Sequence, residues 1–432
     1  MLALLDISEL NEIQIATLQA AEAYSNIVLL AATGSGKTLA YLLPLLKKIE
    51  KKAACTQAVV VVPTRELALQ VANVLGKMKT GLKMLACYGG HDIVSEYNSL
   101  TEAPVIIIGT PGRLIDHMHN GRIDVQNIHS LVMDEFDKLL DLGFEEQLEA
   151  KIEELPQMRN KMLVSATALS KWPHFLSDIN LYTLDFLDTQ AKVNQQIKLC
   201  YLKASGSDKK HLLLNLLCQI GEQQSIVFCN HREDVESVYE FLTEKGLVCS
   251  FYHGGLDQHF RESAISRFIN GSAHTLISTD LAGRGLDIQG LPYVIHYHFA
   301  GTEEIFIHRS GRTARQNEEG TVIFLLRDNE YLPAYAKQAE EMTLSKDLKI
   351  PDLPRWITLS IDGGKKDKLN KVDILGFLIQ KGQMKKESVG IIDVKDRISY
   401  VAVDRLESKG LMSRIKDEKI KKLNVRFRFL NG

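Results

Sequence analysis

Short apolar runs alternate with longer amphipathic stretches along most of the chain, and polar or glycine-rich residues follow each run at once. The runs have the length and β-branched content of buried strands, and the stretches between them have the spacing of helices. The runs of the first half are Ile27–Leu30, Ala58–Val62, Val105–Ile108, Ser130–Met133 and Lys161–Ser165. This alternation predicts a doubly wound parallel sheet, in which ligands bind beyond the carboxyl ends of the strands.

A second series of the same kind follows a polar stretch over 188–196 that predicts a linker. Its apolar runs are Ile226–Cys229, Val248–Tyr252, Thr275–Ser278, Tyr293–His296 and Thr321–Leu325. The second series has no glycine-rich phosphate loop in its sequence. We therefore expect it to repeat the architecture of the first series without repeating its nucleotide site.

The pattern changes again after a stretch that contains Pro351 and Pro354 and predicts a second linker. Two helical stretches are expected there, near Lys371–Gln380 and Asp404–Ser413. The expected strands are Trp356–Ile361, Ile391–Val394, Tyr400–Val403 and Val425–Phe429. The predicted fold class is therefore α/β, with tandem parallel-sheet domains over 1–187 and 196–345 and a small α+β domain over 356–432.

Charge is distributed unevenly along the chain. The net charge is −2, yet residues 356–432 hold 18 Lys and Arg against 10 Asp and Glu. A basic domain attached to an acidic body favours the binding of a polyanion. The sequence has no apolar run of about 18 residues, no signal-peptide pattern at its start and no pairing pattern among its six cysteines. We therefore expect a cytoplasmic protein with reduced thiols and no membrane partner.

The segment Ala31–Thr38 reads Ala-Ala-Thr-Gly-Ser-Gly-Lys-Thr and lies between a predicted strand and a predicted helix. Its glycines let successive amides approach and cradle phosphate oxygens at the helix N-terminus. Lys37 supplies a charge for the β- and γ-phosphates, and Thr38 a hydroxyl for Mg²⁺. The residues predicted to hold the nucleotide here are Thr33, Gly34, Ser35, Gly36, Lys37 and Thr38.

Asp134 and Glu135 follow a predicted strand and can complete this site. We assign Asp134 to the metal and Glu135 to the attacking water. Arg309, Arg312 and Arg315 recur every three residues, and guanidinium groups suit the charge that develops on a γ-phosphate. If these arginines act on the phosphate held by Lys37, the two parallel-sheet domains must close on each other during catalysis.

Other residues at the strand ends can donate hydrogen bonds to a nucleic-acid backbone, and one acid can accept a bond from a 2′-hydroxyl. Each alone is more often a helix cap or a turn residue, and only their shared position at strand ends favours this function. These residues are Thr64, Arg65, Thr110, Gly112, Arg113, His253, Gly254, Thr279 and Asp280.

Together these motifs resemble those of the DEAD-box RNA helicases, over about residues 10–330 and nearly all in family order. The matching segments are Ala31–Thr38, Pro63–Ala68, Gly89–Gly90, Thr110–Arg113, Asp134–Asp137, Ser165–Thr167, Ile226–Asn230, Gln258 with Arg261, Ser278–Asp287 and His308–Arg315. The resemblance implies two RecA-like domains that close around ATP and RNA. It also implies that Gly90 and Arg261 contact RNA.

The resemblance assigns roles to further residues. Gln14 would read adenine and Asp287 would meet the ribose. Arg312 and Arg315 would be arginine fingers. Asp137, Ser165 and Thr167 would couple ATP binding to strand separation.

The chain departs from the family pattern at three places. Phe136 stands where the family has the alanine of Asp-Glu-Ala-Asp, and Asn11-Glu12 stands before Gln14 where Pro-Thr is usual. The sequence starts too late for the family's upstream aromatic residue, which stacks on adenine, so we expect that contact to be missing. We expect activity because Asp134, Glu135 and Asp137 are present. The resemblance leaves nucleotide affinity and selectivity open.

The C-terminal segments Gly363–Leu369 and Asp373–Gly376 resemble the RNA-binding domain of DbpA-type bacterial helicases, a divergent RNA-recognition-motif (RRM) fold. In that subfamily the domain grips a hairpin of large-subunit ribosomal RNA. Lys365, Lys366 and Lys368 would contact RNA here. Tyr400 and Phe427 are candidates for exposed aromatic side chains that stack on bases.

The sequence therefore predicts a monomeric RNA-dependent ATPase and RNA helicase that uses ATP and Mg²⁺ and acts on structured, ribosomal RNA. Two alternatives stay open. One is an ATP-gated RNA clamp without unwinding, in which Phe136 slows turnover. The other is a DNA-directed motor of the same superfamily. RNA-stimulated ATPase activity separates the first from a helicase, and the comparison of RNA with DNA oligomers separates the second.

Overall fold

The computed structural model describes most of the chain. The residues that it leaves undescribed are 1, 6, 33, 91–92, 169–172, 174–175, 177–179, 188–196, 205–207, 281–287, 289, 314–319, 346–347 and 431–432. The chain divides into two compact units, one made almost entirely of residues 1–195 and one made almost entirely of residues 196–432. Within the described residues, no helix is both long and apolar enough to cross a membrane.

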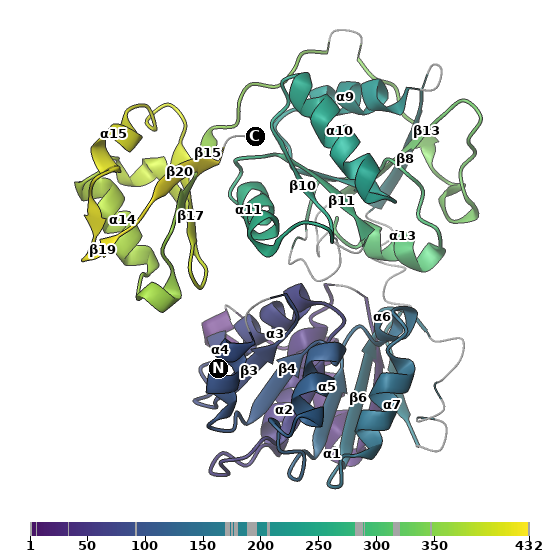
Figure 1. Cartoon of the computed structure of the whole chain (residues 1–432). Helices are drawn as coiled ribbons and strands as arrows, with labels where there is room; N and C mark the ends of the chain where they lie inside the picture. The colour runs from purple at the N-terminus through teal and green to yellow at the C-terminus, as the bar shows by residue number, and fades with distance from the viewer. Residues whose placement is uncertain are drawn as a thin grey trace. The chain divides into compact units, whose positions relative to one another are not determined.

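The first unit is built on a seven-stranded parallel sheet in the order β3-β4-β2-β5-β6-β1-β7. Figure 1 labels β3, β4 and β6 of this sheet. Its strands are β1 (Asn26–Leu30), β2 (Ala58–Val61), β3 (Met84–Cys87), β4 (Ile106–Gly109), β5 (Ser130–Met133), β6 (Asn160–Ser165) and β7 (Tyr182–Asp185). Its helices are α1 (Glu12–Ala23), α2 (Lys37–Lys48), α3 (Arg65–Lys77), α4 (Val94–Leu100), α5 (Pro111–His119), α6 (Phe136–Asp141) and α7 (Glu145–Glu153).

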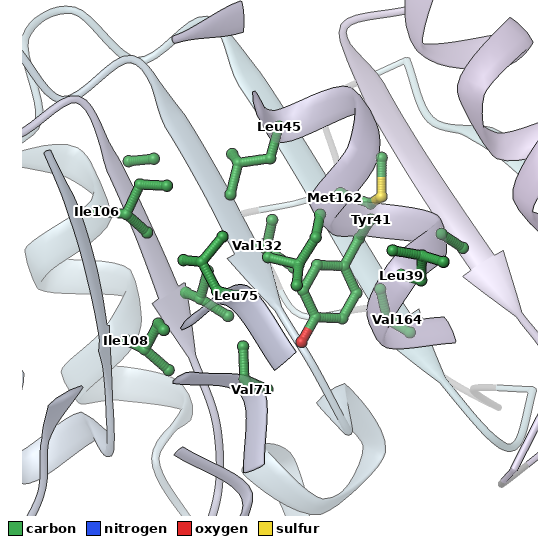
Figure 2. Close-up of a cluster of buried hydrophobic side chains, with 14 of the residues drawn as sticks. Leu39, Tyr41, Leu45, Val71, Leu75, Ile106, Ile108, Val132, Met162 and Val164 are labelled. Atoms are coloured by element: carbon green, nitrogen blue, oxygen red, sulfur yellow. The ribbon is translucent and has the colours of Figure 1, made fainter. Parts of the chain in front are cut away.

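Both faces of this sheet are buried, because neighbouring residues of each strand enter opposite cores. In β1, Ile27 and Leu29 join the core formed with α1, α2 and α3, and Val28 and Leu30 join the core formed with α5, α6 and α7. Figure 2 shows part of the first core, with Tyr41 of α2 among aliphatic side chains. Burial on two faces explains why the strands read as continuous apolar runs.

The second unit repeats this architecture with a seven-stranded parallel sheet in the order β10-β11-β9-β12-β13-β8-β14. Its strands are β8 (Ile197–Lys203), β9 (Ser225–Cys229), β10 (Cys249–Tyr252), β11 (Thr275–Thr279), β12 (Tyr293–His296), β13 (Gly320–Leu326) and β14 (Glu340–Glu341). Its helices include α9 (Lys209–Ile220), α10 (Arg232–Glu244), α11 (Gln258–Ile269) and α13 (Glu303–Ser310).

The same unit carries the C-terminal domain, which has a four-stranded antiparallel sheet in the order β16-β17-β15-β20. These strands are β16 (Val389–Val394), β17 (Ser399–Asp404), β15 (Trp356–Ile361) and β20 (Phe427–Leu430). The helices α14 (Lys371–Gln380) and α15 (Leu411–Ile415) cover one face of the sheet, and the short strands β18 (Lys419–Ile420) and β19 (Leu423–Asn424) form a hairpin.

The predicted fold class is therefore confirmed: two parallel-sheet domains are followed by a small α+β domain. One expected helix is wrong. Residues 405–410 form turns, and only the last part of Asp404–Ser413 is helical, because α15 begins at Leu411 after Gly410 in the left-handed region. Four of the six cysteines are buried, and all six are free thiols.

Candidate nucleotide and RNA sites

The phosphate loop joins β1 to α2 as the sequence predicts. Gly34 and Gly36 have φ values of 83° and 88°, in the region that only glycine adopts readily. A Cβ atom on Gly36 would lie 2.6 Å from Nε2 of Gln14, so a larger residue there would displace the Gln14 side chain as well as strain the backbone. Helix α2 begins at Lys37, and the loop amides therefore precede the positive end of a twelve-residue helix. This cradle fits a polyphosphate.

Gln14 lies on α1 beside this loop. Its Nε2 donates a hydrogen bond to the carbonyl oxygen of Gly36 at 3.4 Å, and its Oε1 accepts one from the backbone N–H of Asn11 at 3.1 Å. Asn11 is the N-cap of α1, and its Nδ2 donates to the carbonyl oxygen of Ser35 at 2.9 Å. Asn11 thus connects α1 with the phosphate loop, a role that sequence reasoning missed because it treated Asn11 only as a departure from the family pattern.

The carboxylates after β5 lie close enough to the loop to interact with Lys37. Burial lowers the pKa of Lys37, and the charges of Asp134, Asp137 and Glu135 oppose that shift. Burial raises the pKa of Asp134 to about 6, although Lys37 opposes the change. A buried carboxylate whose charged form is disfavoured is suited to a cation, which would offset the cost of desolvation. Together with the hydroxyl of Thr38, Asp134 therefore fits a Mg²⁺ ion beside a bound nucleotide.

Glu135 has an unusual backbone conformation for a residue with a side chain. Its φ and ψ are 49° and 50°, in the left-handed region, and it immediately precedes α6. Its N–H donates to Oδ1 of Asp134 at 2.9 Å, and its Oε1 lies 2.9 Å from Nζ of Lys138. Strained backbone of this kind is often retained where a side chain must be aimed. The buried Lys138 is a neighbour of the predicted catalytic acid that sequence reasoning did not single out.

A second unpredicted residue, Tyr41, has its hydroxyl near the carboxylate of Asp134. Its side chain is fully buried in the core of Figure 2, and its hydroxyl has no hydrogen-bond partner within bonding geometry among the described residues. Burial and then the nearby charge of Asp134 raise the pKa of Tyr41 well above its ordinary value. The tyrosine therefore stays neutral and is available as a donor toward the carboxylate.

The residues predicted to couple ATP binding to strand separation are in direct contact. Oγ1 of Thr167 donates to Oδ2 of Asp137 at 2.9 Å. Oγ of Ser165 donates to the carbonyl oxygen of Thr167 at 2.7 Å and accepts from its N–H at 3.1 Å. The end of β6 is thus joined to the start of α6 through side chains, as the assigned function would require.

The predicted RNA contacts of the first unit also lie at carboxyl ends of strands. Thr64 and Thr110 are the N-caps of α3 and α5. The guanidinium group of Arg65 lies beside Gly90, where a Cβ atom would be 2.7 Å from Nη1. Nη1 of Arg113 lies 3.1 Å from the carboxylate of Glu96, and Gly112 is exposed.

In the second unit, Arg261 fixes the turn that carries His253 and Gly254. Its Nε donates to the carbonyl oxygen of Leu256 at 2.8 Å, and its Nη2 donates to that of Gly254 at 3.2 Å. His253 is buried, with Nε2 3.0 Å from Oε1 of Glu236. The turn therefore presents the backbone of Gly254 to solvent.

Thr279 ends β11 and Asp280 follows it, with its carboxylate held by Arg309 of α13. Arg309 is buried and also donates to Oδ1 of Asn230 at 2.9 Å and to the carbonyl oxygen of His298 at 2.7 Å. Arg312 is buried just beyond the end of α13. Thus Arg309 is used within its own domain. Thr33, Asp287 and Arg315, also predicted for the nucleotide site, lie outside the described residues.

In the C-terminal domain, Lys365, Lys366 and Lys368 are exposed around a short 3₁₀ turn. The preceding Gly364 allows this turn to pack on the β16–β17 connection, since a Cβ atom there would lie 2.3 Å from the carbonyl oxygen of Lys395. The two aromatic candidates for base stacking are wrong. Tyr400 is fully buried, and Phe427 is 6% exposed and stacked on Phe377 in the core.

Comparison with known proteins agrees with this geometry. The DEAD/DEAH box helicase family model matches residues 11–174, the helicase conserved C-terminal domain matches 208–317, and the DbpA RNA-binding domain matches 358–428. The chain is 35% identical to ATP-dependent RNA helicase DbpA of Escherichia coli (strain K12), over 98% of this chain and 94% of that protein. It is 30% identical to DbpA of Bacillus subtilis (strain 168), over 93% and 90% respectively.

Among solved structures, S. cerevisiae Dbp5 bound to RNA and ADP BeF3 is similar, with a TM-score of 0.67 and 26% identity over 76% of this chain and 86% of that one. The two parallel-sheet domains of the present chain are thus the RecA-like domains of a helicase core, and its C-terminal domain is RRM-like. The phosphate cradle, the acidic motif and these matches converge on one conclusion: the chain belongs to the DEAD-box family of ATP-dependent RNA helicases.

Proposed function

We propose that this helicase remodels structured ribosomal RNA during assembly of the large ribosomal subunit, as a monomer in the cytoplasm. The observation that carries this proposal is the C-terminal domain, which matches the DbpA RNA-binding domain over residues 358–428 and exposes Lys365, Lys366 and Lys368 at one end. Such a domain brings the helicase core to a particular RNA, since phosphate contacts add affinity and the folded RNA adds selectivity.

In the core, we propose that the loop from Thr33 to Lys37 binds the phosphates of ATP and that Gln14 contacts adenine. Thr38 and Asp134 would hold Mg²⁺, which neutralises charge on the phosphates when it is bound. Glu135 would orient and deprotonate the attacking water. Its αL backbone would aim the carboxylate, and Nζ of Lys138 lies 2.9 Å from its Oε1 atom.

We further propose that Arg312 and Arg315 stabilise the charge that develops on the γ-phosphoryl group, and that Asp287 binds the ribose. Arg309, although it belongs to the same motif, positions Asp280 instead. RNA would be bound by the strand-end residues of both domains, and the contact of Thr167 with Asp137 would transmit ATP binding to them.

Truncation tests the assignment of the target. We expect a chain without residues 356–432 to keep ATPase activity that poly(A) RNA stimulates, and to lose its preference for large-subunit ribosomal RNA. The measurement is kcat/KM for RNA-stimulated ATP hydrolysis with each RNA. Equal preference in the truncated chain would place recognition in the core. In-cell crosslinking followed by sequencing of the bound RNA then identifies the target itself.

A variant with Lys365, Lys366 and Lys368 changed to Gln tests the same surface in the full-length chain. Lys385, Lys386 and Lys416, which are exposed on the same domain, provide the matched triple control. The first triple variant should lose the preference for ribosomal RNA and the second should keep it.

The ATPase assay also tests the two alternatives left open by the sequence, an RNA clamp and a DNA-directed motor. ATP turnover that RNA does not accelerate would favour an RNA clamp over a helicase. Equal stimulation by DNA and RNA oligomers of one sequence would favour a DNA-directed motor.

A further inference from the structure

The face of the C-terminal sheet opposite its helices is covered, although several of its residues are polar or small. In β15, Ile357, Leu359 and Ile361 enter the domain core, so Thr358 and Ser360 lie on the other face. In β17, Val401 and Val403 enter the core, so Tyr400 and Ala402 lie on the other face. Yet Thr358, Tyr400 and Ala402 are fully buried and Ser360 is 4% exposed.

The covering element is the end of α11 with the turn that follows it, in the second RecA-like domain. Nδ2 of Asn270 donates to Oγ1 of Thr358 at 2.9 Å, and Oγ1 of Thr358 donates to Oγ of Ser272 at 2.9 Å. On α11 itself, Oγ of Ser266 donates to Oδ2 of Asp393 in β16 at 3.3 Å. The contact therefore includes directional hydrogen bonds among the buried groups of Asn270, Ser272 and Thr358, which are costly to leave unsatisfied. Asp393 is partly exposed.

Trp356 adds an apolar component to this contact. A Cβ atom on Gly271 would lie 3.3 Å from Cδ1 of the indole, and one on Gly390 would lie 3.3 Å from its Cη2 and Cζ3 atoms. The ring thus lies between the turn of the RecA-like domain and a glycine of β16. Gly271 has a φ of 76°, so both the close approach and the backbone conformation favour glycine.

RRM folds usually stack bases on aromatic side chains of this sheet face. Here the one aromatic residue of β17, Tyr400, is buried, and burial raises the pKa of its hydroxyl, with further contributions from Glu262 of α11 and Asp393. Bases cannot reach Tyr400 while α11 is in place.

We propose that this sheet face is the docking surface for α11 of the second RecA-like domain, so that the RNA-capturing domain and half of the motor move as one body. The proposal deepens the function proposed above and rests on it only for its effect on RNA. A docked domain holds captured RNA at a fixed distance from the helicase core. A domain on a free linker lowers the effective concentration of that RNA at the core.

A charge swap at Ser266 and Asp393 tests the docking. Ser266→Glu places a second carboxylate beside Asp393 at the contact between α11 and β16. Combining Ser266→Glu with Asp393→Lys replaces this repulsion with attraction. Ser413→Glu, at an exposed serine of α15, is the control for the added charge. The chain has two tryptophans, so a Trp172→Phe background makes emission report on Trp356 alone.

In the absence of RNA, we expect Ser266→Glu to shift the emission of Trp356 to longer wavelength and to increase the radius of gyration measured by X-ray scattering. The charge swap should reverse both changes, and the control should show neither. Unchanged emission and radius in Ser266→Glu would overturn the docking, and changes that the swap fails to reverse would overturn the assigned contact. These readouts stand even if the proposed RNA target is wrong.

With RNA, Ser266→Glu should keep wild-type ATPase stimulation by poly(A) RNA. Its kcat/KM for purified large-subunit ribosomal RNA should fall about 10-fold, because the effective concentration of captured RNA at the core falls. Full stimulation by ribosomal RNA in an undocked variant would show that docking has no part in coupling capture to the motor.

Discussion

Phe136 replaces the alanine of the family's acidic motif, and the structure shows where its ring goes. The side chain is fully buried, in the core that α5, α6 and α7 form on the sheet. The ring is therefore part of the packing of the first RecA-like domain and does not occupy the face where nucleotide would bind.

Restoring the family residue should destabilise this chain. We expect Phe136→Ala to lower the free energy of unfolding by about 3–5 kcal/mol, because it removes a large buried side chain and leaves a cavity. Urea unfolding measures the change. Leu142→Ala, at a partly exposed position just after α6, should cost less than about 1 kcal/mol. A Phe136→Ala protein as stable as the wild type would mean that the core closes around the missing ring.

Glu135→Gln should keep the binding of ATP and RNA and abolish turnover. The amide cannot accept the proton of the attacking water, while Asp134 and the phosphate loop are unchanged. Steady-state ATPase activity, with nucleotide affinity measured by titration, checks this. Lys138→Gln is the informative companion, since it removes the cation 2.9 Å from Glu135 and should reduce turnover without abolishing it. Substantial hydrolysis by Glu135→Gln would move the catalytic role to another residue.

Single residues show where sequence reasoning ends. The glycines of the phosphate loop and the acids after β5 could be named from the sequence, because their function fixes both residue type and position. Asn11, Tyr41 and Lys138 could not, since their importance comes from their neighbours: a carbonyl of the loop, the buried carboxylate of Asp134 and the predicted catalytic acid. Tyr400 was misjudged for the same reason, because alternation predicts which face a residue occupies but not what covers it.

At the scale of elements, strands buried on both faces were the most predictable. β5, β12 and β15 have the predicted bounds, and most others differ by one or two residues. β3, β7 and β8 were missed because they are partly exposed and their apolar pattern is interrupted. The helix expected over Asp404–Ser413 failed because side-chain caps from Asp404 fold the segment into turns before Gly410.

The contact between α13 and the end of β12, where His296 lies beside Arg309, makes the free energy of unfolding depend on pH. His296 is fully buried among aromatic rings, and its Nδ1 lies 3.3 Å from Nη1 of Arg309. Burial, and then the charge of Arg309, lower the pKa of His296 well below its ordinary value. The unfolded chain therefore takes up a proton near pH 6.5 that the folded chain refuses, so stability falls as the pH drops below that value.

We expect this residue to account for up to about 1.4 kcal/mol of lost stability for each pH unit below 6.5. Urea unfolding of the wild type and His296→Leu at pH 7.5 and 5.5 isolates the effect as a difference in slope. His259→Leu, at an exposed histidine of α11, should retain the wild-type slope. Parallel slopes for wild type and His296→Leu would show that His296 accepts a proton in the folded state.

At the scale of the whole molecule, charge separates the acidic helicase core from a basic C-terminal domain. Phosphate contacts release counterions, so affinity for single-stranded RNA falls with salt at a slope of about 0.7 per contact. The Lys365, Lys366 and Lys368 triple Gln variant should lower the slope of log affinity against log salt by about 2. Filter binding at salt concentrations between about 50 and 200 mM measures this slope. The triple change at Lys385, Lys386 and Lys416 should leave the slope unaltered if those lysines stay in solvent.

The covered sheet face limits how the target of this enzyme can be changed. Thr358 and Trp356 are committed to the motor, so redesigning β15 or β17 for another transcript would detach the domain that it was meant to retarget. A change of RNA specificity would instead require substitutions in the Gly363–Leu369 turn and in the neighbouring β18–β19 hairpin. Lys421 of this hairpin donates a hydrogen bond to the carbonyl oxygen of Lys368. The turn and the hairpin can thus be varied while the docked sheet is kept unchanged.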